Sequence, residues 1–166
     1  MKRGITKRER EVTEISEILK ILDKSMVVHI GMVDGDEPYV VPMNYGYTME
    51  EGKLTLYLHG ATKGRKLDVL QANPKVFFSL ECDVVPFDGP VACRFGTTYA
   101  SVMGKGRAVV LEDPEEKKRG LSVLMKTQTG RDFTFDDPMV SIVSVIRIDV
   151  EEYTAKRRPM PQRPAE

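Results

Sequence analysis

The chain has 166 residues, 41% of them hydrophobic, and its 25 basic residues balance 25 acidic ones, so the formal net charge is zero. This length suits a single domain with a hydrophobic core. The zero net charge gives no general attraction to nucleic acid or to a membrane surface, and neither is expected as a partner.

The first half of the chain is predicted to form one helix and then short strands. Hydrophobic residues between Ile15 and Leu22 recur with helical spacing, which predicts an amphipathic helix over 13–24, capped near Thr13. Three strands follow, each filled by β-branched or alternating hydrophobic residues, over 25–33, 39–47 and 53–59. Pro42 cannot complete a hydrogen-bond ladder, so its strand is expected at a sheet edge or a bulge.

The second half continues the mixture of strands and helices. Asp113 followed by Pro114 is a typical helix start, which predicts a helix from there to about Lys126. A shorter helix is predicted over 64–72, and residues 83–92 are predicted to be a polar loop. Strands are predicted over 75–81, 94–104, 105–111 and 142–150, with the bend between the middle two marked by glycines.

These elements predict a mainly β (α+β) fold. The short links between the first three strands favour antiparallel pairing. A mostly antiparallel sheet with helices at its margins then forms either an open α+β layer or a small barrel, and strands of this length favour the barrel. Residues 13–155 are predicted to form this domain, between a basic N-terminal arm (1–12) and a tail rich in Pro and Arg (156–166). The two ends are either solvated, or one of them folds over a phosphate-bearing ligand.

The location and metal content follow from absences in the sequence. No hydrophobic run approaches the roughly 20 residues needed to cross a membrane, and the charged N-terminus does not resemble a signal peptide. We therefore expect a cytoplasmic protein. The two cysteines, Cys82 and Cys93, form neither a zinc pattern nor a disulfide framework. Reduced thiols are expected, and no metal.

Three segments could carry chemistry, although the common catalytic motifs, including HExxH, GxSxG and the P-loop, are absent. In residues 59–66 (HGATKGRK), small residues precede a helix start and a basic pair, so this segment is either a phosphate cradle or a plain turn. In residues 40–47, the side-chain amide of Asn44 could form hydrogen bonds with a flat heterocycle. Residues 97–104 carry hydroxyl groups along a strand. Irregular edge structure and ordinary polar alternation are the alternatives for these two segments. His29 is expected to be structural.

Taken together, the runs PYVVPMNYGY (38–47), LYLHGATKGRKLDVL (56–70), YASVMGKGRA (99–108) and RIDVEEYTAK (147–156) resemble the flavin-binding split-barrel proteins. The likeness is to the pyridoxamine-phosphate-oxidase-like superfamily and, within it, to the nitroimidazole-resistance-type flavoproteins. It covers about residues 8–157. It implies a six-stranded antiparallel split β-barrel with peripheral helices, and a homodimer that binds flavin mononucleotide (FMN) at the subunit interface. Flavin adenine dinucleotide (FAD) remains possible.

The resemblance also implies which residues contact the flavin. The isoalloxazine would be lined by Val41, Pro42, Met43, Asn44 and Tyr45. His59, Gly60 and Ala61 would lie beside the ring and ribityl chain, with His59 the candidate catalytic residue. The phosphate would be bound by Gly64, Arg65 and Lys66, and Ser101 would approach the ring from a later strand.

The predicted function is therefore an FMN-dependent oxidoreductase that acts on a small molecule such as a nitroaromatic compound. The chain has no tryptophan and lacks the longer C-terminal substrate segment of true pyridoxamine-phosphate oxidases, so vitamin B6 oxidation is not expected. The alternative is a flavin-binding or sensing protein without turnover.

Overall fold

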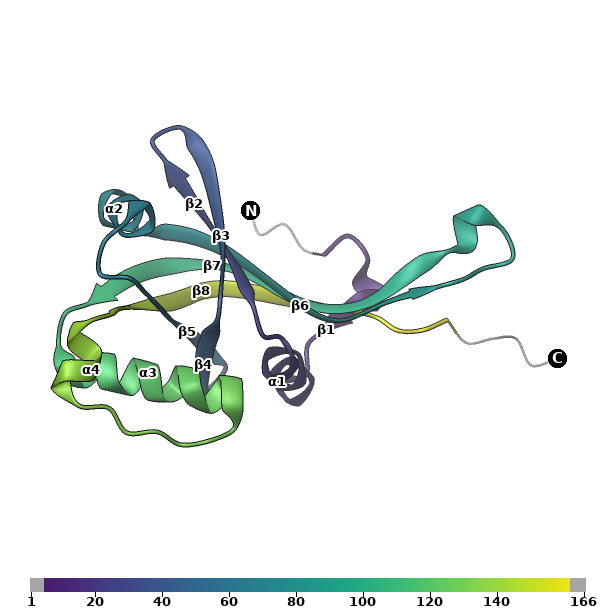
Figure 1. Cartoon of the computed structure of the whole chain (residues 1–166). Coiled ribbons are helices and arrows are strands. Elements are labelled where there is room, and N and C mark those ends of the chain that lie inside the picture. The colour runs from purple at the N-terminus through teal and green to yellow at the C-terminus, as the bar shows by residue number, and fades with distance from the viewer. Residues whose placement is uncertain (1–4, 162–166) are drawn as a thin grey trace.

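The computed structural model describes residues 5–161 and places every strand in one antiparallel sheet (Figure 1). The first and last residues of the expected basic arm and tail (1–4 and 162–166) lie outside the described residues. The strands are β1 (Glu11–Val12), β2 (Val28–Asp34), β3 (Glu37–Met43), β4 (Tyr45–Glu50), β5 (Lys53–Gly60), β6 (Lys75–Phe87), β7 (Gly96–Leu111) and β8 (Ser144–Arg158). The helices are α1 (Ile15–Lys24), α2 (Arg65–Ala72), α3 (Pro114–Thr129) and α4 (Asp137–Ser141), with short 3-10 turns at Arg8–Arg10 and Ala92–Arg94.

The sheet is a barrel that is split along one seam. The strand order is β3-β2-β6-β7-β8-β5-β4, with β1 paired to β8, so β3 and β4 are the two edges. These edges follow one another in the chain and are separated only by Asn44. The predicted split barrel with peripheral helices is therefore confirmed, although the sheet has eight strands in place of the six expected. The strand predicted over 39–47 is broken in two at Asn44, and its first part is an edge strand, as Pro42 indicated.

The later strands are longer than predicted. Residues 96–111 form one continuous strand instead of two, and its register against β8 shifts between Lys105 and Gly106. Gly104 permits the close approach of β7 to β8, because a Cβ at this position would lie 2.4 Å from the carbonyl oxygen of Glu152. β6 extends into the expected polar loop as far as Phe87, and β8 runs to Arg158, beyond the expected end of the domain.

The helix predictions are confirmed for α1, α2 and α3, and differ mainly at their ends. Asp113 caps α3, with its side chain accepting a hydrogen bond of 2.9 Å from the backbone N–H of Glu116. The N-cap position of α1 is Glu14, next to Thr13, but its side chain makes no capping hydrogen bond. The helix α4 was not predicted from the sequence, since its five residues are too few to show helical periodicity.

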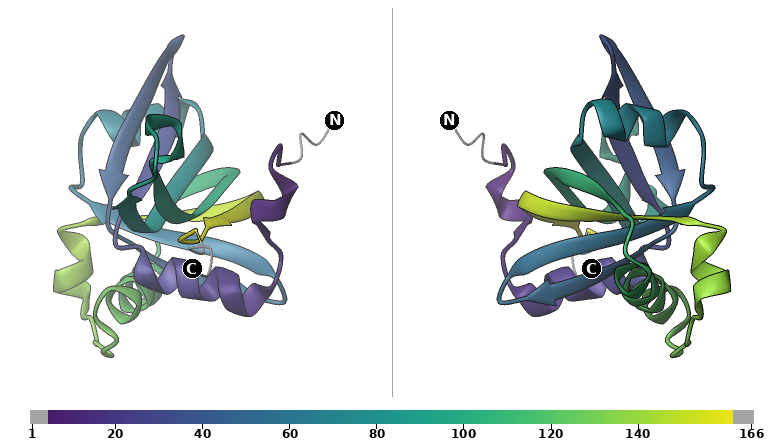
Figure 2. Two further views of the ribbon diagram at one scale, coloured as in Figure 1. Left: turned by 90° about the vertical axis from the view of Figure 1, so that its right-hand side faces the viewer. Right: turned by 90° about the vertical axis from the view of Figure 1, so that its left-hand side faces the viewer.

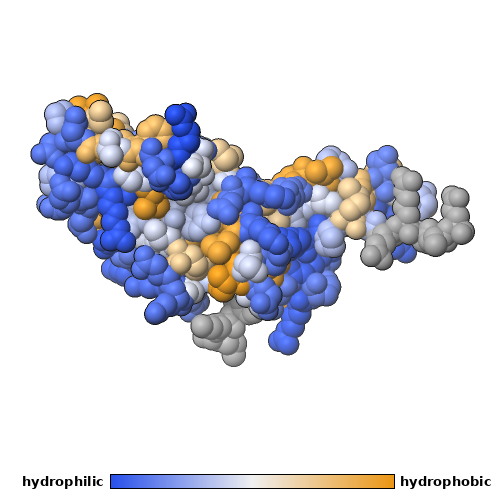
Figure 3. All heavy atoms as spheres, turned by 90° about the horizontal axis from the view of Figure 1, so that it is seen from below, coloured by the Kyte–Doolittle hydropathy of each residue, from blue (hydrophilic) through white to orange (hydrophobic). Residues whose placement is uncertain are grey.

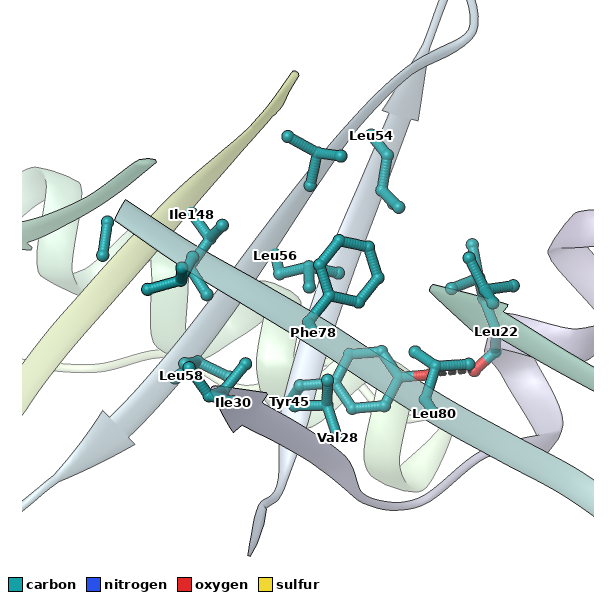
Figure 4. Close-up of a cluster of buried hydrophobic side chains, with 14 of the residues drawn as sticks. Leu22, Val28, Ile30, Tyr45, Leu54, Leu56, Leu58, Phe78, Leu80 and Ile148 are labelled. Atoms are coloured by element: carbon teal, nitrogen blue, oxygen red, sulfur yellow. Dashed lines mark hydrogen bonds between the residues drawn. The ribbon is translucent and has the colours of Figure 1, made fainter. Parts of the chain in front are cut away.

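The core fills the inside of the barrel (Figure 4). The alternating leucines of β5 point inward and meet Phe78 of β6 and Ile148 of β8. Outside the barrel, α3 packs against β4 and β5, while α1 packs against β6 and β7. Figure 2 shows α1 and α3 together below the sheet. Gly46 permits this packing, because a Cβ there would lie only 2.3 Å from Cα of Leu124 in α3.

The two ends of the described chain meet on the sheet. β1 pairs with the end of β8, with Glu11 opposite Lys156 and Val12 opposite Ala155. Part of the expected basic arm and the start of the expected tail are thus strand residues. Cys82 and Cys93 are both free. Among residues 5–161, no helix has the length and apolar character needed to cross a membrane.

Candidate functional site

The loop between β5 and α2 has the features of an anion site. Gly64 adopts φ 140°, which side chains rarely allow, and its carbonyl accepts the N–H groups of Leu67 (2.9 Å) and Asp68 (3.3 Å). No side chain caps α2, so the N–H groups of its first turn, at Arg65 and Lys66, have no partner among the described residues. Such N–H groups, together with the positive end of the helix, are suited to bind phosphate.

Lys66 adds a positive charge beside this loop. Its ammonium donates to Sδ of Met43 at 3.3 Å, and it lies 2.9 Å from the point where a Cβ on Gly60 would be. Partial burial lowers the pKa of Lys66. No carboxylate of the described chain lies within 4.0 Å of its Nζ. A half-buried ammonium without an anionic partner is costly, and an anionic ligand would relieve that cost.

Arg65 points toward the β2–β3 hairpin instead. Its Nε lies 2.7 Å from Oδ2 of Asp34, and one terminal nitrogen lies 3.8 Å from Glu37. The guanidinium also lies over the ring of Tyr39, 4.4 Å from the centroid. The bond to Asp34 raises the pKa of Arg65. Of the two basic residues, only Lys66 is brought to Gly60 and Met43, while Arg65 is tied to the hairpin by Nε and keeps its other N–H groups at the surface.

The residues predicted to line a flat ring are divided between two environments. Val41 and Met43 are half-buried and pack at the edge of the core, while Pro42 is exposed on the opposite face of β3. Because β3 and β5 end near each other, Met43 and Gly60 approach the same lysine. Met43, Gly60 and the start of α2 therefore form one contiguous part of the surface.

Asn44 and Tyr45 are tied into the protein. The side-chain amide of Asn44 donates to the carbonyl of Met26 at 3.1 Å and to Oε1 of Gln128 at 3.5 Å, which uses both of its N–H groups and leaves only its oxygen for a ligand. Tyr45 is fully buried, and its hydroxyl donates to the carbonyl of Leu22 at 2.7 Å (Figure 4). The prediction that the Tyr45 ring packs against a ligand is wrong, because this ring is part of the core. A ligand could meet only the backbone of Tyr45.

His59 and Ser101 lie on very different parts of the sheet. His59 is exposed at the end of β5, on the face opposite Leu58, and its ring has no hydrogen-bond partner among residues 5–161. Ala61 follows in the exposed loop. Ser101 pairs with Lys156 on β8, whereas Gly60 pairs with Ser144, twelve residues away on the same strand. At about 3.3 Å per residue this is roughly 40 Å along the strand. One chain does not bring Ser101 to the loop.

The loop also borders an open hollow of about 660 Å³ between α2 and the end of β7. Its walls include Thr62, Lys63 and Gly64 from the loop and Ser144 from β8. This hollow leaves room beside the anion site for a ligand larger than a phosphate group. In the described part of the chain, no group of three or more His, Cys, Asp or Glu side chains is arranged to hold a metal ion.

Sequence reasoning missed the residues that hold Arg65 in place. Asp34 and Tyr39 flank the turn at Gly35, and the only signal there was a typical hairpin turn. Their contact with Arg65 spans 31 residues of sequence in the case of Asp34, so no local pattern could have revealed it. The contact of Met43 with the ammonium of Lys66 could not be predicted for the same reason, because the two residues are far apart in the sequence.

Comparisons with known proteins agree with this fold. The family model described as pyridoxamine 5'-phosphate oxidase matches residues 14–157. A proposed 5-nitroimidazole antibiotic resistance protein from Bacteroides thetaiotaomicron is 30% identical, with a TM-score of 0.75; the match covers 89% of this chain and 86% of that one.

Two more distant structures share the fold. The flavocytochrome Anf3 from Azotobacter vinelandii has 20% identity and a TM-score of 0.77, over 99% of this chain and 76% of that one. An FAD-binding protein from Mesorhizobium loti has 23% identity and a TM-score of 0.63, over 90% and 98%. No curated protein matches the sequence.

Proposed function

The chain belongs to the pyridoxamine 5'-phosphate oxidase family, and on that premise we propose that it binds FMN and acts as an oxidoreductase on a small molecule. The observation that carries the proposal is the ammonium of Lys66, which has no carboxylate partner among residues 5–161 and lies beside the open first turn of α2. Both features fit a phosphate group, which carries negative charge and accepts several hydrogen bonds. Riboflavin, which lacks the phosphate, would not use them.

Each part of the site would then have its own task. Lys66 and the N–H groups of Arg65 and Lys66 would hold the phosphate, while Gly64 gives the loop its shape. Asp34 holds the guanidinium of Arg65 at the β2–β3 hairpin, so Arg65 would act on the phosphate through its backbone N–H and through its nearby positive charge. When bound, the flavin supplies the hydride and electron transfer, so the protein needs no acid–base motif of its own.

The ring side of the flavin would lie along the seam. Val41 and Met43 offer apolar side chains there, Pro42 offers only its backbone, and the oxygen of Asn44 remains free to accept a hydrogen bond. Gly60 leaves space for the ligand, and exposed His59 could adjust the charge near the ring. Because Ser101 lies far from this place in its own chain, we assign its contact with the flavin to a second copy, and thus propose a homodimer with a shared site.

The substrate class rests on the solved structure that is 30% identical to this chain. That protein is a proposed 5-nitroimidazole antibiotic resistance protein, so a nitroaromatic compound is our candidate substrate, in preference to pyridoxamine phosphate. A flavin-binding protein without turnover is the second candidate. It is favoured by the absence of any carboxylate within 4.0 Å of His59 among the described residues, which leaves that imidazole without a partner for acid–base work.

The decisive experiment starts from the protein as purified. A flavin spectrum, with FMN identified by mass after release, is the expected result; FAD would change the assigned ligand, and a colourless protein that ignores added FMN would refute the proposal. Reduction by NADH or NADPH and reoxidation by a nitroimidazole then distinguish the two candidates. Reoxidation with formation of a reduced nitro product supports the enzyme, and its absence supports the binding protein.

A further inference from the structure

The ammonium of Lys66 rests on a group that satisfies it poorly. Its side-chain contact is Sδ of Met43, which accepts a hydrogen bond of 3.3 Å from Nζ. A thioether sulfur is a weak hydrogen-bond acceptor. Within residues 5–161, no carboxylate lies within 4.0 Å of this Nζ to take its place. A change that turned Met43 into a strong acceptor would therefore alter the state of Lys66.

Met43 lies where a small reagent in solution can reach it. It is the last residue of β3, a free edge of the sheet, and both of its chain neighbours are exposed. The Met43 side chain itself is half-buried and packs at the margin of the core. Met32 on β2, by contrast, is only 3% exposed and belongs to the core. A peroxide should therefore reach the sulfur of Met43 but not that of Met32.

Exposure alone does not distinguish Met43 from the other methionines. Seen from below, hydrophobic residues reach the surface in several separate places (Figure 3). The most exposed methionines of the described chain, at 39–53%, are Met26, Met103, Met139 and Met160. In that same part of the chain, Met43 is the only methionine whose sulfur accepts a hydrogen bond from a charged group. What sets Met43 apart is the neighbouring ammonium.

We propose that Met43 is a site of reversible oxidation, and that its sulfoxide takes up the ammonium of Lys66. The oxidant is hydrogen peroxide. The sulfur lone pair forms a bond to one peroxide oxygen, the O–O bond breaks, and the sulfur loses two electrons. The new S–OH group gives up its proton to the departing hydroxide, which leaves as water. Methionine sulfoxide reductases return the sulfoxide to the thioether.

Oxidation changes both parts of the contact. A sulfoxide is polar, and its oxygen is a much stronger acceptor than a thioether sulfur. Because this oxygen is bonded to a sulfur only 3.3 Å from Nζ, it can accept a charge-assisted hydrogen bond from Lys66. A phosphate must then compete for the ammonium, and Met43 no longer offers an apolar surface to a ring. The loss of flavin affinity rests on the proposed function, which assigns Lys66 to the phosphate of FMN.

The first measurement is FMN affinity before and after treatment of the full-length protein with hydrogen peroxide. If the sulfoxide takes about half of the hydrogen-bond free energy of Lys66, wild type should bind FMN about 4- to 12-fold more weakly after treatment. Met43→Leu, which keeps a similar volume without the sulfur, should change less than twofold on treatment. The matched control is Met139→Leu on exposed α4, which should lose as much affinity as wild type. Mass mapping of peptides locates the added oxygen.

The second measurement needs no flavin. The sulfoxide oxygen stabilises the charged form of Lys66, so oxidation should raise the pKa of its ammonium. A pH titration of the Lys66 side-chain signal by NMR follows this change. Met43→Gln places a carbonyl acceptor at the same position without any oxidant, so it should also raise the pKa of Lys66. This variant supplies the answer should oxidised wild type lose its fold.

The outcomes separate this inference from the proposed function. Met43 left unoxidised while Met139 and Met160 are oxidised would overturn the inference, as would an equal loss of FMN affinity in Met43→Leu. An unchanged pKa of Lys66 in both oxidised wild type and Met43→Gln would also overturn it. A raised pKa of Lys66 with unchanged FMN affinity would support the new contact and refute the assignment of Lys66 to the phosphate. A raised pKa in a protein that ignores FMN would support the contact and refute the proposed function.

Discussion

Replacing Gly60 with alanine tests the site at the point where the structure is most specific. The new Cβ would lie 2.9 Å from Nζ and 3.7 Å from Cε of Lys66. Real Cβ atoms do not approach so closely, so the ammonium must retreat by roughly 0.5 Å. Because this is the far end of a flexible side chain, the fold should absorb the change. Alanine in an extended strand also restricts the unfolded chain, so the melting temperature should stay the same or rise slightly.

The affinity for FMN should fall although the fold is intact. A hydrogen bond to a charged group contributes about 1.5–3 kcal/mol. If displacement of the ammonium removes about half of this hydrogen-bond free energy, the dissociation constant for FMN rises about 4- to 12-fold. Riboflavin has no phosphate for Lys66 to bind in the proposed site, so its affinity should change less than twofold. Titration of flavin fluorescence with wild-type and variant apo-protein measures both constants.

A double-mutant cycle shows whether the effect passes through Lys66. In a Lys66→Ala background there is no ammonium to displace, so adding Gly60→Ala should cause no further loss of FMN affinity. The reasoning is refuted if the double variant binds FMN more weakly than Lys66→Ala alone. It is refuted equally if Gly60→Ala weakens riboflavin and FMN to the same extent, because the methyl group would then obstruct the ring.

Three other substitutions probe separate parts of the molecule. Lys66→Ala should weaken FMN binding about 10- to 150-fold, whereas Lys53→Ala, at the exposed start of β5, should not. Burial lowers the pKa of Lys66, so between the lowered and the ordinary pKa the unfolded chain binds more protons than the folded chain. The stability of the apo wild type relative to Lys66→Ala should therefore increase as the pH rises through that window. Denaturant titrations in which this difference decreases with pH would contradict the prediction. Gly46→Ala places a Cβ against the backbone of α3, so unfolding should become easier by about 3 kcal/mol, or roughly 6–12 °C in melting temperature. His59→Gln should leave the apo melting temperature unchanged but alter the flavin spectrum or its rate of reduction; a large loss of stability would show that His59 is structural.

The sequence predicts those parts of the fold that depend on local pattern. Alternation of the leucines in β5 predicted that His59 would face away from the core, and the structure agrees. Pro42 marked an edge strand because proline lacks the N–H that an inner strand requires. Asp113 showed the start of α3 because a short acceptor can cap free N–H groups without any tertiary contact.

The remainder depends on contacts between distant residues. Tyr45 could serve a core or a ligand equally well by its chemistry, and the deciding contact is with Leu22 in α1. Arg65 and Lys66 are neighbours in the chain, yet Asp34 draws only the first of them to the β2–β3 hairpin. The separation of Ser101 from Gly60 follows from a register that extends over the whole length of β8. No pattern within a single segment carries this information.

The prolines of β3 also bear on solubility. β3 is a free edge of the sheet, and a free edge offers unpaired backbone groups on which strands of other molecules can add and aggregate. At residues 38, 40 and 42 of β3 the backbone N–H position is directed away from β2, toward any strand that would add to this edge. Residues 38 and 42 are prolines, so of these three positions only Val40 has an N–H group to donate. Replacing both prolines would leave the seam intact but open the molecule to edge-to-edge association, so these residues protect the free edge from non-specific strand addition.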